Sequence, residues 1–482
     1  MPSDCSIVWL QRDLRLDDQP AFAAAVARGQ PVIPVFIHSG AGGNGALGSA
    51  SAWWLHHSLT ALGSQLENIG SRLILRSGET QTVLDQLIQE TGATAVYWSR
   101  RYEPEHIVRE QHLLSKLRQR GLTVARFNSS LLFEPGEVQT RTGTPYQVFT
   151  PFWKSVSPRL SAISAQPEIK ALRRPATWPA SESLTAWQLL PSIPWDGGFY
   201  HRWTPGEAGA RQRLKQFLKN AVFQYATDRN HPAQTGTSRL SPHLHFGEIS
   251  PHRIVLELHQ QLGVIPDDAR IFLSEIGWRE FAHHILYHFP QTPQEPLRKV
   301  FQRFPWNQNQ PSEWRAWTHG QTGYPIVDAG MRELWTTGWM HNRVRMIVGS
   351  FLTKDLRISW YEGARWFWDT LVDADLASNT LGWQWVGGCG ADAAPYFRIF
   401  NPVSQGEKFD ATGDYVRRWV PELARLSNPW IHQPWNAPDW ELTQAGVRLG
   451  ETYPAPIVDH AKARVAALAA FQSIKVTDSQ CD

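Results

Sequence analysis

The chain has 482 residues, of which 42% are hydrophobic, so it is too long for a disulfide-stabilised mini-domain and too apolar for a largely disordered protein. Its 47 basic and 44 acidic residues leave a net charge of +3, and any surface that binds a polyanion must therefore arise from local clustering. Cys5, Cys389 and Cys481 lack the spacing of metal ligands, so we expect no metal site and a reducing compartment. No apolar run reaches membrane-spanning length, which favours a cytoplasmic protein without a membrane segment.

Residues 1–135 alternate short β-rich runs with longer amphipathic stretches. The runs predict strands at 6–10, 31–37, 72–75, 95–99 and 122–127, and the stretches predict helices at 21–28, 51–68, 80–90 and 108–120. This alternation is typical of βαβ units and a parallel, Rossmann-like α/β domain. Such sheets bind ligands beyond the carboxyl ends of their strands, so a ring-shaped ligand is expected near 9–15 or 99–105. No GxGxxG or P-loop motif follows the first strand.

The pattern changes after this domain. Residues 136–205 contain Pro- and Ser-rich sequence and are predicted to form an interdomain linker that runs over the surface. Residues 206–475 show apolar spacing of i, i+3 and i+4 and predict an all-α domain. Residues 476–482 are predicted to form a frayed tail.

Three features of the second domain suggest chemistry. The segment TGTSRLSPHLHFGEIS (235–250) offers hydroxyl groups and Arg239 just before a helix, which suits a phosphate or diphosphate but also an ordinary helix cap. Asn342 and Arg345 share one helical face. Asp373 and Asp375 stand among apolar residues, where an isolated carboxylate is unfavourable, so we expect one of them to pair with an arginine.

Tryptophan is concentrated in the same domain. The chain has 24 tryptophans, and eleven of them lie between residues 278 and 385. Core packing is the ordinary role of any single one. The cluster as a whole suggests a further role.

The motifs TGTSRLS, WREF, TGYPIVDA, TGWMHNRVRM, SFLTKDL, DADLASNTLGWQW and DAAPYFRIFNPVSQGEKFD together resemble the DNA photolyase/cryptochrome family. The resemblance runs from VWLQRDLRLDD to YPAPIVDH and is greatest to bacterial cyclobutane pyrimidine dimer photolyases. WWLHHSL (53–59) and LASNTLGWQW resemble the class nearest plant cryptochromes. The resemblance implies an N-terminal antenna domain and a C-terminal catalytic domain that holds FAD in a folded conformation.

The resemblance also implies a set of residues for FAD. Arg345 would pair with Asp373 beside the flavin ring, and Asn379 would place an amide at the flavin N5. The whole set is Tyr225, Thr237, Ser238, Arg239, Leu240, Ser241, Arg279, Trp339, Asn342, Arg345, Asp373, Asp375 and Asn379.

Further residues would serve electron transfer and the substrate. Trp383, Trp360 and Trp306 match the chain of tryptophans that carries electrons from the surface to the flavin. Photolyases are a known example of enzymes that flip a base out of the DNA stack. The residues that would line the pocket for the flipped dimer or grip its phosphates are Glu275, Trp278, Arg343, Met346, Trp385 and Arg398, with Lys408, Arg417 and Arg418 as further phosphate candidates.

The implied function is light-driven repair of cyclobutane pyrimidine dimers in UV-damaged DNA, by electron transfer from excited, reduced FAD. Asn379 and Trp385 favour repair over plant cryptochromes, which tend to carry Asp and Tyr there. A cryptochrome-type blue-light photoreceptor is the alternative, and a non-photochemical flavin protein is a third. WWLHHSL favours methenyltetrahydrofolate as the antenna, with 8-hydroxy-deazaflavin as the alternative. We expect a monomer in the bacterial cytoplasm, at the nucleoid when bound to DNA.

Overall fold

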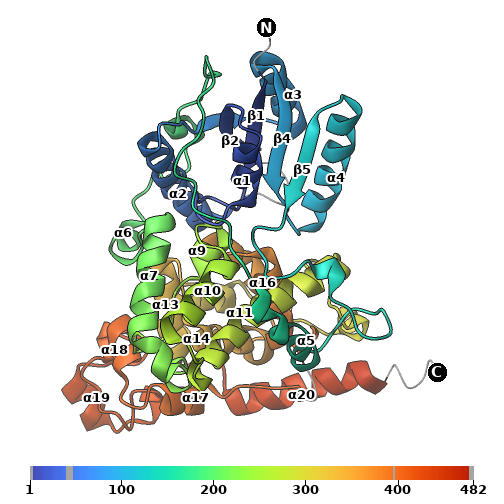
Figure 1. The fold of residues 1–482 in the computed structure, drawn as a ribbon. Helices are drawn as coiled ribbons and strands as arrows, with labels where there is room; N and C mark the ends of the chain where they lie inside the picture. Colours follow the sequence, from blue (N-terminus) through green and yellow to red (C-terminus); the bar gives the residue numbers. More distant parts are fainter. Residues whose placement is uncertain (1–3, 40–46, 394–396, 477–482) are drawn as a thin grey trace.

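The computed structural model describes residues 4–39, 47–393 and 397–476. Its N-terminal part holds a sheet of five parallel strands in the order β3-β2-β1-β4-β5 (Figure 1). The strands are β1 (Cys5–Leu10), β2 (Val32–His38), β3 (Ile74–Ser77), β4 (Ala93–Ser99) and β5 (Thr123–Phe127). Each strand begins and ends within two residues of its predicted bounds, and the predicted parallel α/β domain is confirmed.

Four helices cover this sheet: α1 (Pro20–Ala27), α2 (Ser49–Asn68), α3 (Thr80–Thr91) and α4 (Pro104–Gln119). Helix α4 begins four residues before the predicted start at residue 108, because Pro104 and the acidic Glu105 form its first turn. Side chains of β1 alternate between the two faces of the sheet. Ile7 and Trp9 pack with α3 and α4, whereas Val8 and Leu10 pack with α1 and α2.

The core beneath α2 continues into the rest of the molecule. Phe246, Trp339 and Val372 belong to the helical part of the chain, yet they pack in one cluster with Val8 and Leu10 of the sheet. The two parts of the molecule therefore share a hydrophobic core, which fixes the sheet relative to the helices below it (Figure 1).

The segment at 136–205 contains the helices α5 (Phe149–Val156) and α6 (Gly197–Arg202) and little other regular structure. It runs beside the sheet in Figure 1. The Val32 amide donates to the Arg173 carbonyl at 2.9 Å, and the Glu182 amide donates to the Leu75 carbonyl at 2.9 Å. These bonds show that the predicted surface connection also covers part of the sheet near β2 and β3.

The remainder is helical, as predicted. A π-helical turn, η6 (Phe351–Asp355), follows α14, and the last helix ends at Val476, so residues 477–482 of the predicted frayed tail lie outside the described part. The α-helices are α7 (Glu207–Lys219), α8 (Tyr225–Asp228), α9 (Ser241–His245), α10 (Pro251–Leu262), α11 (Asp267–His288), α12 (Pro311–Thr318), α13 (Pro325–Thr337), α14 (Asn342–Ser350), α15 (Trp360–Thr370), α16 (Leu376–Gly387), α17 (Pro402–Phe409), α18 (Asp414–Trp419), α19 (Asp439–Ala445) and α20 (His460–Val476).

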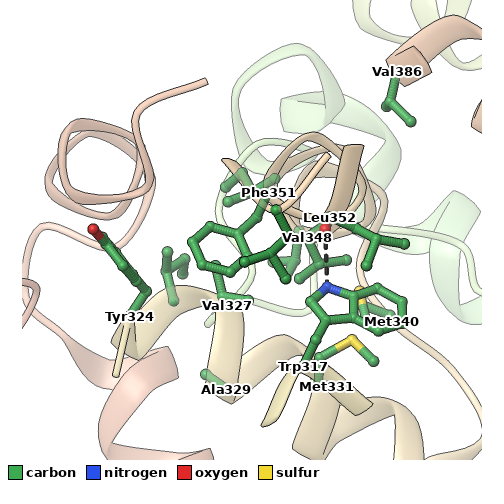
Figure 2. Packing of buried hydrophobic residues seen from close by; sticks show 14 of the residues in the cluster. Trp317, Tyr324, Val327, Ala329, Met331, Met340, Val348, Phe351, Leu352 and Val386 are labelled. Carbon is green, nitrogen blue, oxygen red and sulfur yellow. Dashed lines mark hydrogen bonds between the residues drawn. The ribbon is translucent and has the colours of Figure 1, made fainter. Parts of the chain in front are cut away.

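The largest core of the helical domain surrounds α13 and α14. Figure 2 shows the indole of Trp317 between Met331, Met340 and Leu352, and its N–H donates to the Val348 carbonyl at 3.1 Å. This satisfied, fully buried indole holds α12 against α14. Among the described helices, none combines the length and apolar character that crossing a membrane requires.

Candidate functional site

The segment that precedes α9 carries an arginine, Arg239, with a buried N–H group that has no hydrogen-bond partner. Arg239 has a positive φ of 53°, a conformation that is uncommon outside glycine. Its guanidinium carbon lies 5.1 Å from the centre of the Trp339 ring, and its Nε is buried without a hydrogen-bond partner. Burial and the neighbouring Arg202 lower the pKa of Arg239 to about 10. This arrangement fits an anion such as a diphosphate, because an anion would both satisfy the donor and neutralise the charge.

An ion pair lies beside this segment. Arg345 on α14 donates to both oxygens of Asp373, at 2.8 and 3.1 Å, and the Ser241 hydroxyl donates to the same carboxylate at 2.6 Å. The Arg345 guanidinium carbon also lies 5.9 Å from the centre of the Trp339 ring. The expected pairing of an arginine with one of the two aspartates is therefore observed, and four residues of the predicted FAD set meet here.

The other predicted FAD residues have various neighbours. Asn342 begins α14. Leu240 is buried in a core cluster that also contains Tyr225. The Ser238 hydroxyl accepts a bond from the Leu240 amide at 3.4 Å, and Thr237 is partly exposed beside it. The Asn379 side-chain amide donates to the Ala364 carbonyl at 3.0 Å.

Asp375 and Arg279 line a different small space. Asp375 caps α16 by accepting from the Ser378 amide at 2.8 Å, and its other oxygen lies 3.5 Å from His283 Nε2. Burial would raise the pKa of Asp375, but His283 and His245 hold it well below its ordinary value. Arg279 donates to the Ser130 carbonyl at 2.6 Å. Both residues line a small cavity together with Arg12 and Arg101 of the N-terminal domain, and none of residues 237–241 lines it.

Three of the predicted substrate residues are brought together by the turn after α8. Arg229 forms an ion pair with Glu275 at 2.6 Å, and the next residue, Asn230, accepts from Arg343 at 2.5 Å. Arg343 also lies 3.7 Å from the Met346 sulfur. Two adjacent residues thus connect α11 to α14. Arg229 and Asn230 were not among the predicted residues, although they lie only four and five residues after the predicted Tyr225.

The two predicted substrate tryptophans have different partners. Trp278 on α11 stacks on Phe149 of α5, with ring centres 3.9 Å apart and planes 11° from parallel. Trp385 on α16 lies 5.5 Å from the guanidinium carbon of Arg398. Of the further phosphate candidates, Arg417 donates to the Thr412 and Leu426 carbonyls. These bonds tie Arg417 to the segments before and after α18, and its contact with phosphate stays a prediction.

All three predicted electron carriers belong to one hydrophobic core or pack against it. The predicted partner Trp360 is 4% exposed, and the partly buried Trp306 packs on Phe304 with ring centres 4.4 Å apart. A second series was not predicted. It runs from Trp383 to Trp317 (6.2 Å), Trp314 (5.5 Å), Trp366 (6.1 Å) and Trp335 (6.3 Å) between successive ring centres, and Trp335 is 52% exposed.

A cavity of about 320 Å³ opens at the carboxyl ends of β1 and β2, facing the helical domain. Its wall includes Trp9, Arg12, Arg101, His106 and Arg109 from the sheet side, with Trp368 and Leu376 from the helical side. This is the strand end at which the sequence predicted a ring-shaped ligand. Of the WWLHHSL segment only Leu55 reaches the wall.

Both tryptophans of the WWLHHSL segment are buried in the protein interior. Trp53 and Trp54 are 1% and 0% exposed, and the Trp54 indole donates to Glu248 at 2.9 Å. In the described ranges, no three His, Cys, Asp or Glu side chains are arranged to hold a metal ion.

Family models match both domains. The model described as DNA photolyase matches residues 6–173, and the model described as the FAD binding domain of DNA photolyase matches residues 272–473.

Individual proteins match almost the whole chain. A deoxyribodipyrimidine photo-lyase of Agrobacterium fabrum is 52% identical over 98% of both chains. Cryptochrome-1 of Arabidopsis thaliana is 39% identical, over 96% of this chain and 69% of its own. The crystal structure of a bacterial class III photolyase from Agrobacterium tumefaciens has a TM-score of 0.94 and 51% identity, and the match covers 98% of both chains.

Proposed function

Because the chain belongs to the DNA photolyase/cryptochrome family, we propose that it is a deoxyribodipyrimidine photo-lyase that repairs cyclobutane pyrimidine dimers in UV-damaged DNA with light. The observation that carries the proposal is the 52% identity to a protein of that name over nearly its whole length. Plant cryptochromes match with lower identity. Asn379 and Trp385, at positions where plant cryptochromes tend to carry Asp and Tyr, support repair as well.

The chain's own residues fit FAD. Bound and reduced, FAD supplies an electron when it absorbs light. Arg239, with Thr237, Ser238, Leu240 and Ser241, would hold the diphosphate, which explains a buried Nε without a partner. The pair Arg345–Asp373 would orient donors and positive charge toward the ring system. Tyr225, Arg279, Trp339, Asn342, Asp375 and Asn379 complete the proposed set.

Glu275 and Trp278 would receive the flipped dimer. The indole of Trp278 offers an apolar stacking face, and Glu275 is held beside it, one helical turn earlier on α11. Because Arg229 neutralises Glu275 at 2.6 Å, the carboxylate is positioned without an unpaired charge. Arg343, Met346, Trp385 and Arg398 would line the rest of the pocket, and one chain supplies the whole set, so we propose a monomer that acts at the bacterial nucleoid.

We propose that the cavity at the strand ends holds the antenna, methenyltetrahydrofolate, with 8-hydroxy-deazaflavin as the alternative. Arg12 is buried with one unpaired guanidinium nitrogen, and Arg109 has a buried, unpaired Nε, so the wall suits a ring system that carries negative charge. A structural neighbour of 29% identity is described as an archaeal photolyase with two FAD molecules. Release of the pigment by acid and its absorption spectrum would identify it, and Arg109→Ala should reduce its occupancy while FAD stays bound.

The decisive experiment compares repair in light and darkness. The purified protein with chemically reduced FAD should restore a UV-irradiated oligonucleotide in blue light and leave it unchanged in the dark. Glu275→Ala should lower the repair yield per photon more than it lowers affinity for the lesion, since a carboxyl group matters most when charge reaches the pyrimidine. Equal affinity for damaged and intact duplex, with no repair in light, would favour the cryptochrome alternative.

A further inference from the structure

Lys354 is a buried cation that the proposed chemistry does not use. It lies in η6 and is 0% exposed. Its Nζ donates to the Gly387 carbonyl at 2.6 Å and stands 3.5 Å from the centre of the Phe397 ring. Across the described residues, no carboxylate forms an ion pair with it. A buried ammonium group that has only a carbonyl and an aromatic face is costly to the fold.

The charged groups of the surrounding elements are engaged elsewhere or exposed. Asp355, the next residue of η6, pairs with His460 of α20. Burial raises the pKa of the adjacent Cys389 thiol to about 12, so this group is neutral. Arg298 adds a like charge and donates to the Gly388 carbonyl at 3.2 Å. The other charged side chains of the packed helices are Arg343 and Arg345 of α14, Glu362, Arg365 and the exposed Asp369 of α15, Asp375 at the start of α16, and the exposed Lys462, Arg464 and Lys475 of α20.

Lys354 contacts residues that in turn contact two of the proposed electron carriers. Gly387, whose carbonyl it binds, is so close to Trp360 that a Cβ there would lie 3.6 Å from the Trp360 Cβ. On the other side, Phe397 lies 5.9 Å from Phe304, which lies 4.4 Å from Trp306, between ring centres. The ammonium group is therefore one residue away from Trp360 and two aromatic rings away from Trp306.

We propose that Lys354 tunes the oxidation of Trp360 and Trp306, so that its protonation controls how efficiently electrons pass inward along the tryptophan chain. The inference rests on the proposed function, because it assumes that these tryptophans carry electrons. Each electron that leaves Trp383 is replaced from Trp360, which is refilled from Trp306, and a thiol in the solvent refills Trp306. A positive charge on Lys354 opposes the positive charge left on Trp360 or Trp306. A neutral Lys354 side chain does not oppose that charge.

Lys354 changes its charge within the pH range in which the protein can be assayed. Burial lowers the pKa of Lys354 to about 7. Below this pH the side chain is charged and disfavours oxidation of its neighbours, and above it the opposition disappears. Light-driven reduction of the flavin should therefore become more efficient as pH rises from 6 to 8.5.

The test measures the yield of light-driven flavin reduction, with a thiol as electron donor, from pH 6 to 8.5. In the unsubstituted protein the yield should rise roughly fivefold or more. Lys354→Met removes the charge and keeps an unbranched chain, so its yield should stay high at every pH. Lys354→Arg keeps the charge and should hold the yield low at every pH. Lys475→Met is the matched control: this exposed lysine lies 4.5 Å from the Phe471 ring of the same aromatic cluster and should leave the profile unchanged.

Two outcomes would overturn the proposal. One is a flat pH profile in the unsubstituted protein, a result that needs no variant to fold. The other is an unchanged profile in Lys354→Met that still binds FAD. Repair by chemically reduced protein should keep its own pH profile in Lys354→Met, because that reaction does not use the chain. Trp360→Phe separates the two hypotheses: normal photoreduction in it would refute the proposed electron route, whatever Lys354 does.

Discussion

The carboxylate of Asp373 connects two sides of the proposed flavin site, since it accepts from both Arg345 and Ser241. Asp373→Asn keeps the shape but leaves the partly buried Arg345 without its counter-charge. We expect a loss of about 2 kcal/mol in the free energy of unfolding and weaker retention of FAD. Urea unfolding and flavin content after dialysis measure the two effects.

The surface provides a matched control for this change. Glu362 and Arg365 also form an ion pair, at 3.4 Å, but their side chains are 45% and 66% exposed. Glu362→Gln should therefore cost less than about 1 kcal/mol and leave FAD bound. Equal losses in the two variants would show that burial does not govern the Asp373 pair.

Lys354 yields a second prediction for a single residue, concerning stability. Its pKa is about 7 in the folded protein and about 10.5 in its ordinary state, so the unfolded chain binds more protons between these values and stability rises with pH there. Lys354→Met should thus stabilise the fold most below pH 7. The gain should shrink by at most roughly 1.4 kcal/mol per pH unit up to pH 10.5. Thermal unfolding of both proteins at pH 6.5 and 9.5 tests this, and a gain that does not depend on pH would contradict it.

At the level of elements, helix α5 supports a wall of the proposed substrate pocket. Its Phe149 is 8% exposed and stacks directly on Trp278. Phe149→Leu keeps most of the buried volume but removes the stacked ring, so Trp278 should lose its fixed orientation. We expect affinity for dimer-containing DNA to fall by about 1 kcal/mol while FAD content stays the same. Fluorescence anisotropy with damaged and intact oligonucleotides measures the change.

Phe152→Leu on the same helix is the control, because the Phe152 ring contacts Phe281 and His284. It should destabilise the protein to a similar degree without altering the preference for damaged DNA. A similar fall in preference for both variants would mean that α5 acts only through general stability.

The same elements show how far the sequence could be interpreted. The strands and helices could be predicted from the local periodicity of apolar residues. An ion pair between an arginine and an aspartate could be predicted because Asp373 stands among apolar residues, and the structure shows it as Arg345–Asp373. The stack of Phe149 on Trp278 could not be predicted, because no local pattern links α5 to a helix that lies far along the chain. Trp53 and Trp54 show a second limit of interpretation from local sequence. Their motif favours methenyltetrahydrofolate only through a resemblance, and it does not show that both rings are buried in the core.

On the scale of the whole molecule, the cavity at the strand ends depends on both domains. Arg12 and Arg109 come from the sheet side, whereas Trp368 and Leu376 come from the helical domain. The cavity lies at the strand ends for which the sequence predicts a ligand, because ligands bind there in parallel sheets. The helical half of the wall depends on how the domains pack, which rests on the shared core around Phe246 and Trp339 and on polar contacts between residues far apart in the chain, such as the ion pair of Asp17 with Arg253.

Electron entry is a second property of the whole molecule, and two series of tryptophans are candidates for it. One is the predicted series Trp360 and Trp306. The other begins at Trp317 and reaches the exposed Trp335 through rings whose centres lie 5.5 to 6.3 Å apart. Trp383→Phe should block both, because phenylalanine is much harder to oxidise, at a stability cost of about 1–3 kcal/mol for the smaller ring.

We expect Trp383→Phe to bind FAD and damaged DNA, to fail at light-driven reduction of the flavin, and to repair dimers once the flavin is reduced chemically. Trp360→Phe and Trp317→Phe then test the two series separately, since each removes one tryptophan of a single series and leaves the other series in place. If the first series dominates, Trp360→Phe reduces the photoreduction rate strongly and Trp317→Phe reduces it little. Photoreduction at the normal rate in Trp383→Phe would exclude this residue as the common entry, and loss of repair with reduced flavin would instead make it part of the substrate site.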